Sequence, residues 1–404
     1  MKSEFQEILS VMEQRVQTRP RGFDLFIKEL FSNLLRAFEE ERKTVYVSGY
    51  AFPVELLWAF DVVPFDFEIA CNNLPAAGMG QGSSMMRVSE NAGFSRDICS
   101  FDRLIISCQL RGELPKGALY LTSSYYCHGK AKANEIVARA EGKESVLFDV
   151  PNEISPASRQ YVVAQLQDIA SRLEAITGQS LDLDRLKESI RSSNRASASL
   201  RGINDLMKNR PCPWDGVRAC LLSLAGAIFW GAPIQEQILA LIFREIKDRI
   251  ERGAVQPENY RILWYPWVPV QTTNIFTTLK ENQVSVPLAE VSHIWWSEMD
   301  EDHPFEALAQ KALENYLLGP ASKRVQSLLR LTEEYRVDGV IHFSTPACHH
   351  DNAAFRLISD ALKAKGFPVL NLDGDMTDER NYSPQRTLSK LTSFLEMLKS
   401  KPNN

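Results

Sequence analysis

The chain has 404 residues, a formal net charge of −5 and 44% hydrophobic side chains, enough for two or three domains with substantial cores. Its basic residues form no block, which argues against a nucleic-acid-binding protein. The longest apolar stretches are interrupted by serine and glycine and are too short to span a membrane. The N-terminus is polar and does not resemble a signal peptide, so we expect a cytoplasmic protein.

Residues 1–155 are expected to form N-terminal helices followed by a first α/β domain. Residues 1–42 have helical apolar spacing, and Pro20 to Gly22 separates two helices. Further along, apolar runs predict strands that alternate with helices. The predicted strands are Thr44–Gly49, Val62–Phe67, Gly117–Thr122 and Ser145–Val150, and the predicted helices are Val54–Phe60, Met85–Gln109 and Lys130–Glu141. This alternation predicts a parallel sheet with right-handed crossovers.

Residues 156–257 have almost no strand signal and predict an all-helical insertion. From residue 258 the alternation of strands and helices resumes and continues to residue 404. The predicted strands there are Tyr260–Tyr265, Val284–Leu288, Val337–Phe343 and Phe367–Leu372. The fold class is therefore α/β: two Rossmann-like parallel-sheet domains, an all-helical insertion and a helical N-terminus.

Two of the seven cysteines follow predicted strands directly. Cys127 comes after the third strand of the first domain, and Cys348 comes after a buried strand of the second. Open α/β sheets place their chemistry at the carboxyl ends of strands, and a helix N-terminus there favours a thiolate. Cys99 lies ahead of the strand that leads to Cys127. Three such thiolates could meet in a cleft and bind an iron–sulfur cluster, copper(I) or zinc.

The same cysteines could also be ordinary core residues, because free cysteine is among the most buried residue types. No CxxC spacing appears, and disulfides are not expected without an export signal. The remaining cysteines are expected to be core or surface thiols; they are Cys71, Cys108, Cys212 and Cys220. Four tryptophans could line an aromatic pocket or pack in the core; they are Trp264, Trp267, Trp295 and Trp296.

Three segments together resemble the 2-hydroxyacyl-CoA dehydratase D-component family, which includes the iron–sulfur subunits of benzoyl-CoA reductase. The first, residues 49–64, contains Pro53-Val-Glu55-Leu and ends at Pro64. The second joins Ile98-Cys99 to Tyr126-Cys127-His-Gly-Lys. The third runs from Val337 through Cys348 to Asp375. They occur in the order typical of the family and span most of residues 44–398.

The resemblance implies that Cys99, Cys127 and Cys348 bind one [4Fe-4S] cluster that keeps an open iron. It also implies a heterodimer or homodimer of related subunits and an ATP-dependent iron–sulfur activator that supplies one electron. In dehydratases of the family, the electron turns an acyl-CoA substrate into a ketyl radical that expels hydroxide, loses a β-proton and returns the electron. The acid/base candidate of the family corresponds to Glu55.

Adding an electron to the thioester would ease both the loss of a poor leaving group and the removal of a weakly acidic proton. Two alternatives remain at this point. One is a reductase subunit of the benzoyl-CoA or double-cubane type, and the latter would need extra ligands such as Cys71 or Cys108. The other is a partner subunit that relays electrons or acts as a scaffold.

The sequence departs from the family beside two of these cysteines. His128 and His349 stand where the family often has aspartate, and His350 follows. Because histidine is a poorer helix cap than aspartate, these histidines could instead orient ligands or carry protons, or be polar loop residues.

Overall fold

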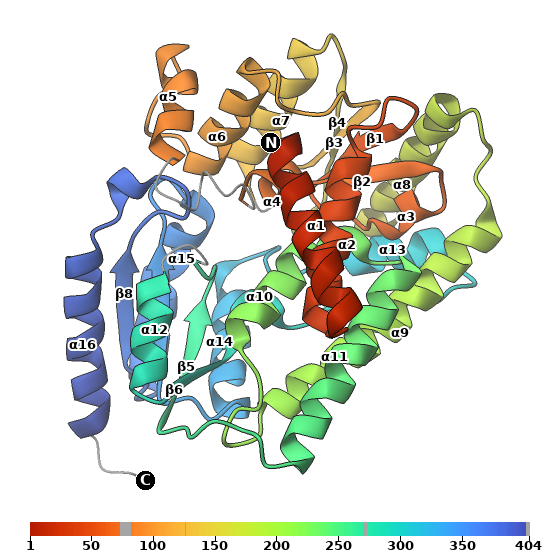
Figure 1. Cartoon of the computed structure of the whole chain (residues 1–404). Coiled ribbons are helices and arrows are strands. Elements are labelled where there is room, and N and C mark those ends of the chain that lie inside the picture. The colour runs from red at the N-terminus through yellow and green to blue at the C-terminus, as the bar shows by residue number, and fades with distance from the viewer. Residues whose placement is uncertain (73–81, 126, 270–272, 401–404) are drawn as a thin grey trace.

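The computed structural model describes residues 1–72, 82–125, 127–269 and 273–400. Two N-terminal helices, α1 (Lys2–Thr18) and α2 (Gly22–Arg36), form a hairpin at one side of the molecule (Figure 1). The predicted break between them is confirmed. The buried side chains of α2 face the rest of the protein and include Phe26, Leu30 and Leu34.

The first sheet has four parallel strands in the order β2-β1-β3-β4. The strands are β1 (Lys43–Tyr46), β2 (Val62–Phe65), β3 (Leu119–Ser123) and β4 (Ser145–Phe148). The helices are α3 (Glu55–Trp58), α4 (Phe67–Asn72), α5 (Gly82–Asn91), α6 (Ser100–Leu110) and α7 (His128–Ala140). The strand order reverses between β1 and β3, as it does at the ligand-binding crevice of doubly wound folds.

The prediction of one helix over Met85–Gln109 is wrong. The chain leaves α5 at Asn91, and Gly93 adopts a left-handed backbone with φ of +96°, which a helix cannot continue through. A second helix, α6, begins at Ser100. Cys99 therefore precedes the first turn of a helix and is not inside one.

A helical segment separates the two sheets, as predicted. It contains α8 (Pro156–Thr177), α9 (Leu183–Met207), α10 (Gly216–Ala225) and α11 (Pro233–Glu251). Ser155, Asp182 and Asp215 each cap the N-terminus of a helix by accepting a hydrogen bond from its first turn. None of the helices in the described part of the chain is both long and apolar enough to cross a membrane.

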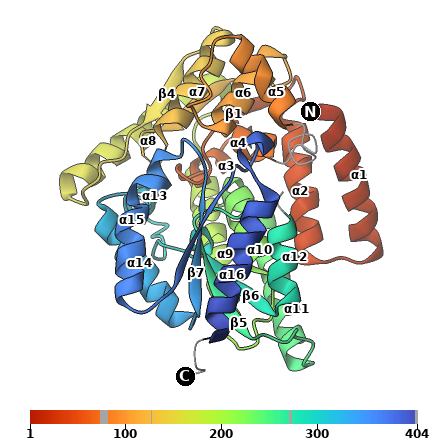
Figure 2. The same ribbon diagram turned by 90° about the vertical axis from the view of Figure 1, so that its left-hand side faces the viewer.

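The second sheet repeats the plan of the first, with parallel strands in the order β6-β5-β7-β8. The strands are β5 (Tyr260–Tyr265), β6 (Val284–Ala289), β7 (Gly339–Ser344) and β8 (Val369–Asp373). The helices are α12 (Thr273–Glu281), α13 (Pro304–Leu313), α14 (Ala321–Glu334), α15 (His349–Ala364) and α16 (Pro384–Ser400). Helices α14 and α15 lie on one side of the sheet, and α12 and α16 lie on the other (Figure 2).

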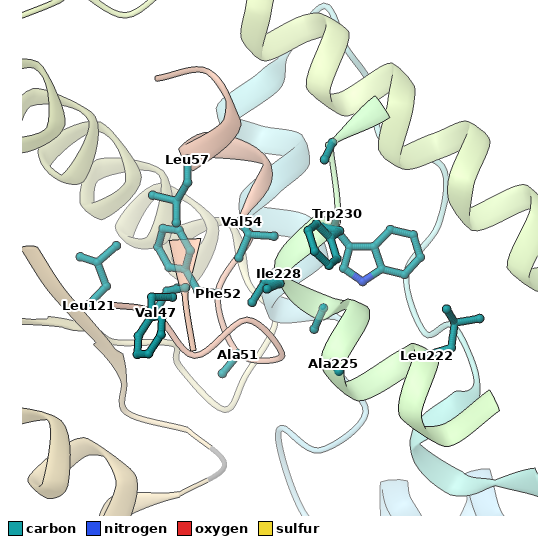
Figure 3. Packing of buried hydrophobic residues seen from close by; sticks show 14 of the residues in the cluster. Val47, Ala51, Phe52, Val54, Leu57, Leu121, Leu222, Ala225, Ile228 and Trp230 are labelled. Atoms are coloured by element: carbon teal, nitrogen blue, oxygen red, sulfur yellow. The ribbon is translucent and has the colours of Figure 1, made fainter. Parts of the chain in front are cut away.

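One hydrophobic core joins the first sheet to the helical segment. The chain after β1 places Ala51, Phe52 and Val54 against Ile228 and Trp230, which follow α10 (Figure 3). A second core fills the space between the second sheet and α12 and α16, with Ile341 and Phe394 among its members. The predicted fold class is thus confirmed, and the helical segment packs directly beside the carboxyl end of β1.

Candidate functional site

A cavity of about 830 Å³ lies outside the carboxyl ends of both sheets. Seven segments that follow strands contribute to its wall. The lining residues after the strands of the first sheet include Ser48, Asp66, Ser124 and Asp149, and those after the strands of the second include Trp267, Thr345 and Met376. The carboxyl ends of parallel strands are the usual binding position in open α/β folds. The repeated topology therefore turns two such positions toward one shared space.

Three of the four predicted site residues line this cavity: Cys99, Cys127 and Cys348. Each of these residues directly precedes the first residue of a helix, namely α6, α7 and α15. The N-terminus of a helix carries a partial positive charge, which stabilises a thiolate or another anion. Cavity, cysteines and helix N-termini therefore form one environment that suits a negatively charged group held by sulfur.

The backbone near two of these cysteines orients the thiols. The backbone N–H of Lys130 donates to Cys127 Sγ at 3.3 Å. Ala347, directly before Cys348, has a left-handed φ of +62°, an uncommon conformation for a residue with a side chain. Such local strain persists only where the surrounding structure holds it, and it is common at functional sites.

Burial raises the pKa of all three thiols, that of Cys127 to about 12 and those of Cys99 and Cys348 well above their usual range. Neighbouring acidic groups add to the effect, Asp102 at Cys99 and Asp351 at Cys348. Without a metal these thiols are therefore neutral at physiological pH. Metal binding would displace their protons, because a coordinated thiolate is deprotonated.

A buried cation and two carboxylates lie next to Cys127. Lys130 Nζ is 3.3 Å from Asp66 Oδ1 and 2.5 Å from Glu68 Oε2. Burial opposes the charge on Lys130, but these carboxylates outweigh it and raise the pKa of the ammonium group. Asp66 also accepts a hydrogen bond from the backbone N–H of Gly49, which links the end of β2 to the end of β1. The group fixes the first turn of α7 against the sheet.

A second buried group lies next to Cys348. Cys348 Sγ donates to Asp351 Oδ2 at 3.2 Å, and Trp267 Nε1 donates to the same oxygen at 2.6 Å. Arg324 bonds Asp351 through one nitrogen and Glu290 through two others. Although burial opposes ionisation of Asp351, the Arg324 guanidinium lowers the pKa of this carboxyl group. Asp351 thus remains an acceptor that orients the thiol.

Glu55, the fourth predicted site residue, is not among the residues that line the cavity. It begins α3 and is completely buried. Its Oε1 accepts hydrogen bonds from Ser193 and Lys311, and Lys311 lies over the rings of Trp230 and Trp296. The predicted role of Glu55 in acid/base chemistry stays a prediction, and its contacts here are those of a buried ion pair.

The histidines predicted beside the cysteines also line the cavity. His128 and His349 are exposed or half-buried first residues of their helices, and His350 follows in the first turn of α15. Burial lowers the pKa of His350, and His128 acts on it in the same direction, which places the two rings near one another. These side chains are therefore positioned at the cavity to bind polar groups or to exchange protons.

The four tryptophans divide between the two expected roles. Trp267 lines the cavity, and Trp264 and Trp296 are buried core residues. Trp295 packs against Tyr50, which itself lines the cavity. The aromatic wall of the cavity is therefore smaller than a pocket made by all four.

The other cysteines mostly behave as expected. Cys71 and Cys108 are buried with their sulfur atoms 3.9 Å apart, and neither lines the cavity. Cys212 is half-buried near Trp214. Cys220 is a buried thiol, as expected, but it also forms part of the cavity wall on α10. No strand-end position or spacing in the sequence signals that location.

Asp102 is a second cavity residue that the sequence reasoning missed. It follows Cys99 by three residues on α6 and is 3% exposed. Burial, with a contribution from Glu68, raises the pKa of its carboxyl group to about 7. The misassigned helix over residues 85–109 hid the signal, since only a helix starting at Ser100 places Asp102 in the first turn beside Cys99.

Among the described residues, no three His, Cys, Asp or Glu side chains are close enough to hold a single metal ion. A [4Fe-4S] cluster has different requirements, because each cysteine binds a separate iron atom and the sulfur atoms stand farther apart. Three thiols from three segments at one cavity, each at a helix N-terminus, match the donor type and charge that such a cluster needs.

Comparisons with known proteins agree with this chemistry. Residues 49–398 match the family described as 2-hydroxyglutaryl-CoA dehydratase, D-component. One of the two kinds of benzoyl-CoA reductase relative is represented by a subunit from Thauera aromatica that is 25% identical, over 86% of this chain and 87% of its own length. The (R)-2-hydroxyisocaproyl-CoA dehydratase alpha subunit from Clostridioides difficile is 22% identical, over 96% of this chain and 98% of its own length. The (R)-phenyllactyl-CoA dehydratase alpha subunit from Clostridium sporogenes is also 22% identical, over 80% and 83%.

Proposed function

This chain belongs to the 2-hydroxyglutaryl-CoA dehydratase D-component family, and from that premise we propose that it is the iron–sulfur subunit of a radical 2-hydroxyacyl-CoA dehydratase. The observation that carries the proposal is the meeting of Cys99, Cys127 and Cys348 at one cavity. These residues are far apart in the sequence, and the helices that follow them direct their N-termini toward the same space.

In this proposal the three cysteines hold a [4Fe-4S] cluster, which supplies one electron at low potential and an open iron for the substrate. The chain itself binds and shields the acyl group. Apolar side chains cover part of the cavity wall and keep water away; they include Phe101, Leu224, Val268 and Leu317. Ser48, Tyr50 and Tyr125 offer hydroxyl groups that can orient the thioester and its 2-hydroxyl group.

The proposal includes two protein partners. Relatives of this chain are named as alpha and beta subunits of dehydratases, which supports assembly with a related subunit. The electron would come from a separate ATP-dependent iron–sulfur activator, because amino-acid side chains such as those that line the cavity are not reductants of the required strength. The overall reaction removes water from a 2-hydroxyacyl-CoA and returns the electron.

A benzoyl-CoA-reductase-type subunit is the second candidate. It is favoured by the similarity to the benzoyl-CoA reductase subunit and by the ring of Trp267 at the cavity. A double-cubane reductase has less support, because Cys71 and Cys108 face each other and do not line the cavity. A scaffold without chemistry of its own also has less support, because a scaffold does not need a cavity with buried titratable groups.

The test combines the anaerobically purified protein, a copurified related subunit, an ATP-dependent activator and a panel of acyl-CoA thioesters. Products are identified by mass spectrometry. Loss of water from a 2-hydroxyacyl-CoA, dependent on ATP and abolished in Cys127→Ala, is the expected result. Reduction of an aryl-CoA without dehydration would select the second candidate instead. No turnover of either class would contradict both.

A further inference from the structure

Asp102 presents an unsatisfied carboxyl group to the cavity. The residue lines the cavity yet is only 3% exposed. Its Oδ1 atom is buried and has no hydrogen-bond partner among the described residues. Buried polar atoms in native proteins are nearly always paired, so an unpaired carboxyl oxygen at a cavity points to a group that acts on a ligand or exchanges protons.

The carboxyl group lies in the corner between two of the cysteines. Asp102 is in the first turn of α6, which Cys99 precedes, and it reaches across to the first turn of α7, which Cys127 precedes. A Cβ atom at Gly129 would lie 2.3 Å from Asp102 Oδ2 and 3.8 Å from Cys127 Sγ. Glycine at position 129 therefore leaves the space that the carboxyl group occupies beside the thiol.

The charged groups around Asp102 allow its proton to be both held and released. Glu68 on α4 disfavours the carboxylate, and Lys130 on α7 favours it. The nearby thiols are Cys99 and Cys127. Glu90 on α5, the other helix that packs on α6, is engaged by Arg103 and leaves Asp102 alone. A group that is balanced in this way works as both acid and base near neutral pH.

We propose that Asp102 is the proton-transfer group of the cavity, acting on the substrate of the dehydration proposed above, on which this inference rests. The neutral carboxyl group gives its proton to the 2-hydroxyl group as the C–O bond breaks, and water leaves. The resulting carboxylate then takes the proton from the neighbouring β-carbon. One proton is given and one is recovered, and the electron from the ATP-dependent activator is returned, so the cycle closes.

The position of Glu55 supports this assignment. Its carboxylate is completely buried, bonds Lys311 and Ser193, and does not line the cavity. Reaching a substrate would require it to break a buried ion pair. Asp102 needs no such rearrangement, because it already faces the space between the cysteines.

The test compares Asp102→Asn and Asp102→Glu with Asp97→Asn, which removes an exposed carboxylate at the rim of the same cavity. Iron and sulfide content reports whether the cluster is retained. Infrared difference spectra in H₂O and D₂O report the protonated carboxyl band through a pH titration, independently of turnover. Dehydration rates are measured across pH with 2-hydroxyacyl-CoA.

We expect Asp102→Asn to retain iron, to lose one protonated carboxyl band and to dehydrate about 10²–10⁴-fold more slowly, with the pH dependence near neutrality removed. Asp102→Glu should restore the band and part of the rate, and Asp97→Asn should match the wild type. Wild-type activity with an unchanged rate in Asp102→Asn would overturn this inference and leave the proposed function standing. Loss of iron in both Asp102 variants would also overturn it, as a structural role. A wild type that retains iron but does not dehydrate would overturn the proposed function itself.

Discussion

The two sheets follow one plan, and their differences explain how one site is assembled. Both have four parallel strands with the first strand between the second and the third. Cys127 and Cys348 each lie four residues after the end of the third strand, and a helix begins directly after each. An acidic residue follows the second strand in both sheets, Asp66 in the first and Glu290 in the second. The repeated geometry thus sets the positions.

The charges at matching positions are reversed. Three residues after the cysteine, the first sheet has Lys130 and the second has Asp351. Lys130 itself neutralises Asp66, whereas Asp351 requires Arg324 from α14, which also neutralises Glu290. The same plan therefore accommodates opposite local charges, provided that each buried group contains a cation to balance its acids.

The third cysteine breaks the symmetry. Cys99 precedes α6, and the corresponding helix of the second sheet, α14, is preceded by Pro320. The first sheet therefore contributes two thiols and the second sheet contributes one. A three-thiol site that leaves one coordination position open follows naturally from a duplicated plan in which one half lacks its second cysteine.

Breaking the two buried ion groups should give the largest effect on stability. Arg324→Met leaves Glu290 and Asp351 without a cation, and the free energy of unfolding should fall by about 3–5 kcal/mol. Lys130→Met should cost less, because the Glu68 side chain is 25% exposed and can be rehydrated. Urea denaturation of the metal-free protein measures both. Arg356→Met, which removes an exposed ion pair with Asp360, is the control and should change stability by less than about 0.5 kcal/mol. An equal or larger loss for Lys130→Met would contradict the comparison.

The pH dependence of stability should reveal Asp102, which has no counterpart in the second sheet. Its pKa is about 7 in the folded protein and near the usual carboxyl value when unfolded, so the folded state holds the proton more tightly. Its contribution to stability is therefore fully present below about pH 4 and is lost as pH rises to about 7. Asp102→Asn should remove this loss, and the variant should gain roughly 3 kcal/mol on the wild type between pH 5 and pH 8. Parallel pH profiles of the two metal-free proteins would show that Asp102 is not perturbed.

The smallest effect is expected two residues after each cysteine. The first sheet has Gly129 there and the second has His350. Gly129→Ala should lower stability by about 1 kcal/mol, the low end for overpacking, because the Asp102 side chain can rotate away. That rotation exposes the carboxyl group and should shift its infrared titration to lower pH. His350→Ala should leave the same titration unchanged, and a shift of equal size in both variants would argue against close packing of Gly129 on Asp102.

Much of this fold was predictable because strands of a parallel sheet are continuous apolar runs, and the strand-end positions of Cys127 and Cys348 followed from them. The break before α6 was not predicted, since residues 85–109 keep a helical pattern on both sides of Gly93. The buried ion groups could not be predicted either. Glu290, Arg324 and Asp351 belong to three separate elements, and only tertiary packing brings them together. For the same reason, the sequence suggested Glu55 as a site residue but not its pairing with Lys311.

The central claim is that the two sheets share one cluster, and iron analysis of matched cysteine variants tests it directly. Wild type, Cys348→Ala and Cys212→Ala are purified without oxygen, and iron and acid-labile sulfide are measured per chain. The account predicts about four iron and four sulfide in the wild type and in Cys212→Ala, as a four-iron cluster requires, and a large loss in Cys348→Ala. No iron in the wild type, or unchanged iron in Cys348→Ala, would contradict it.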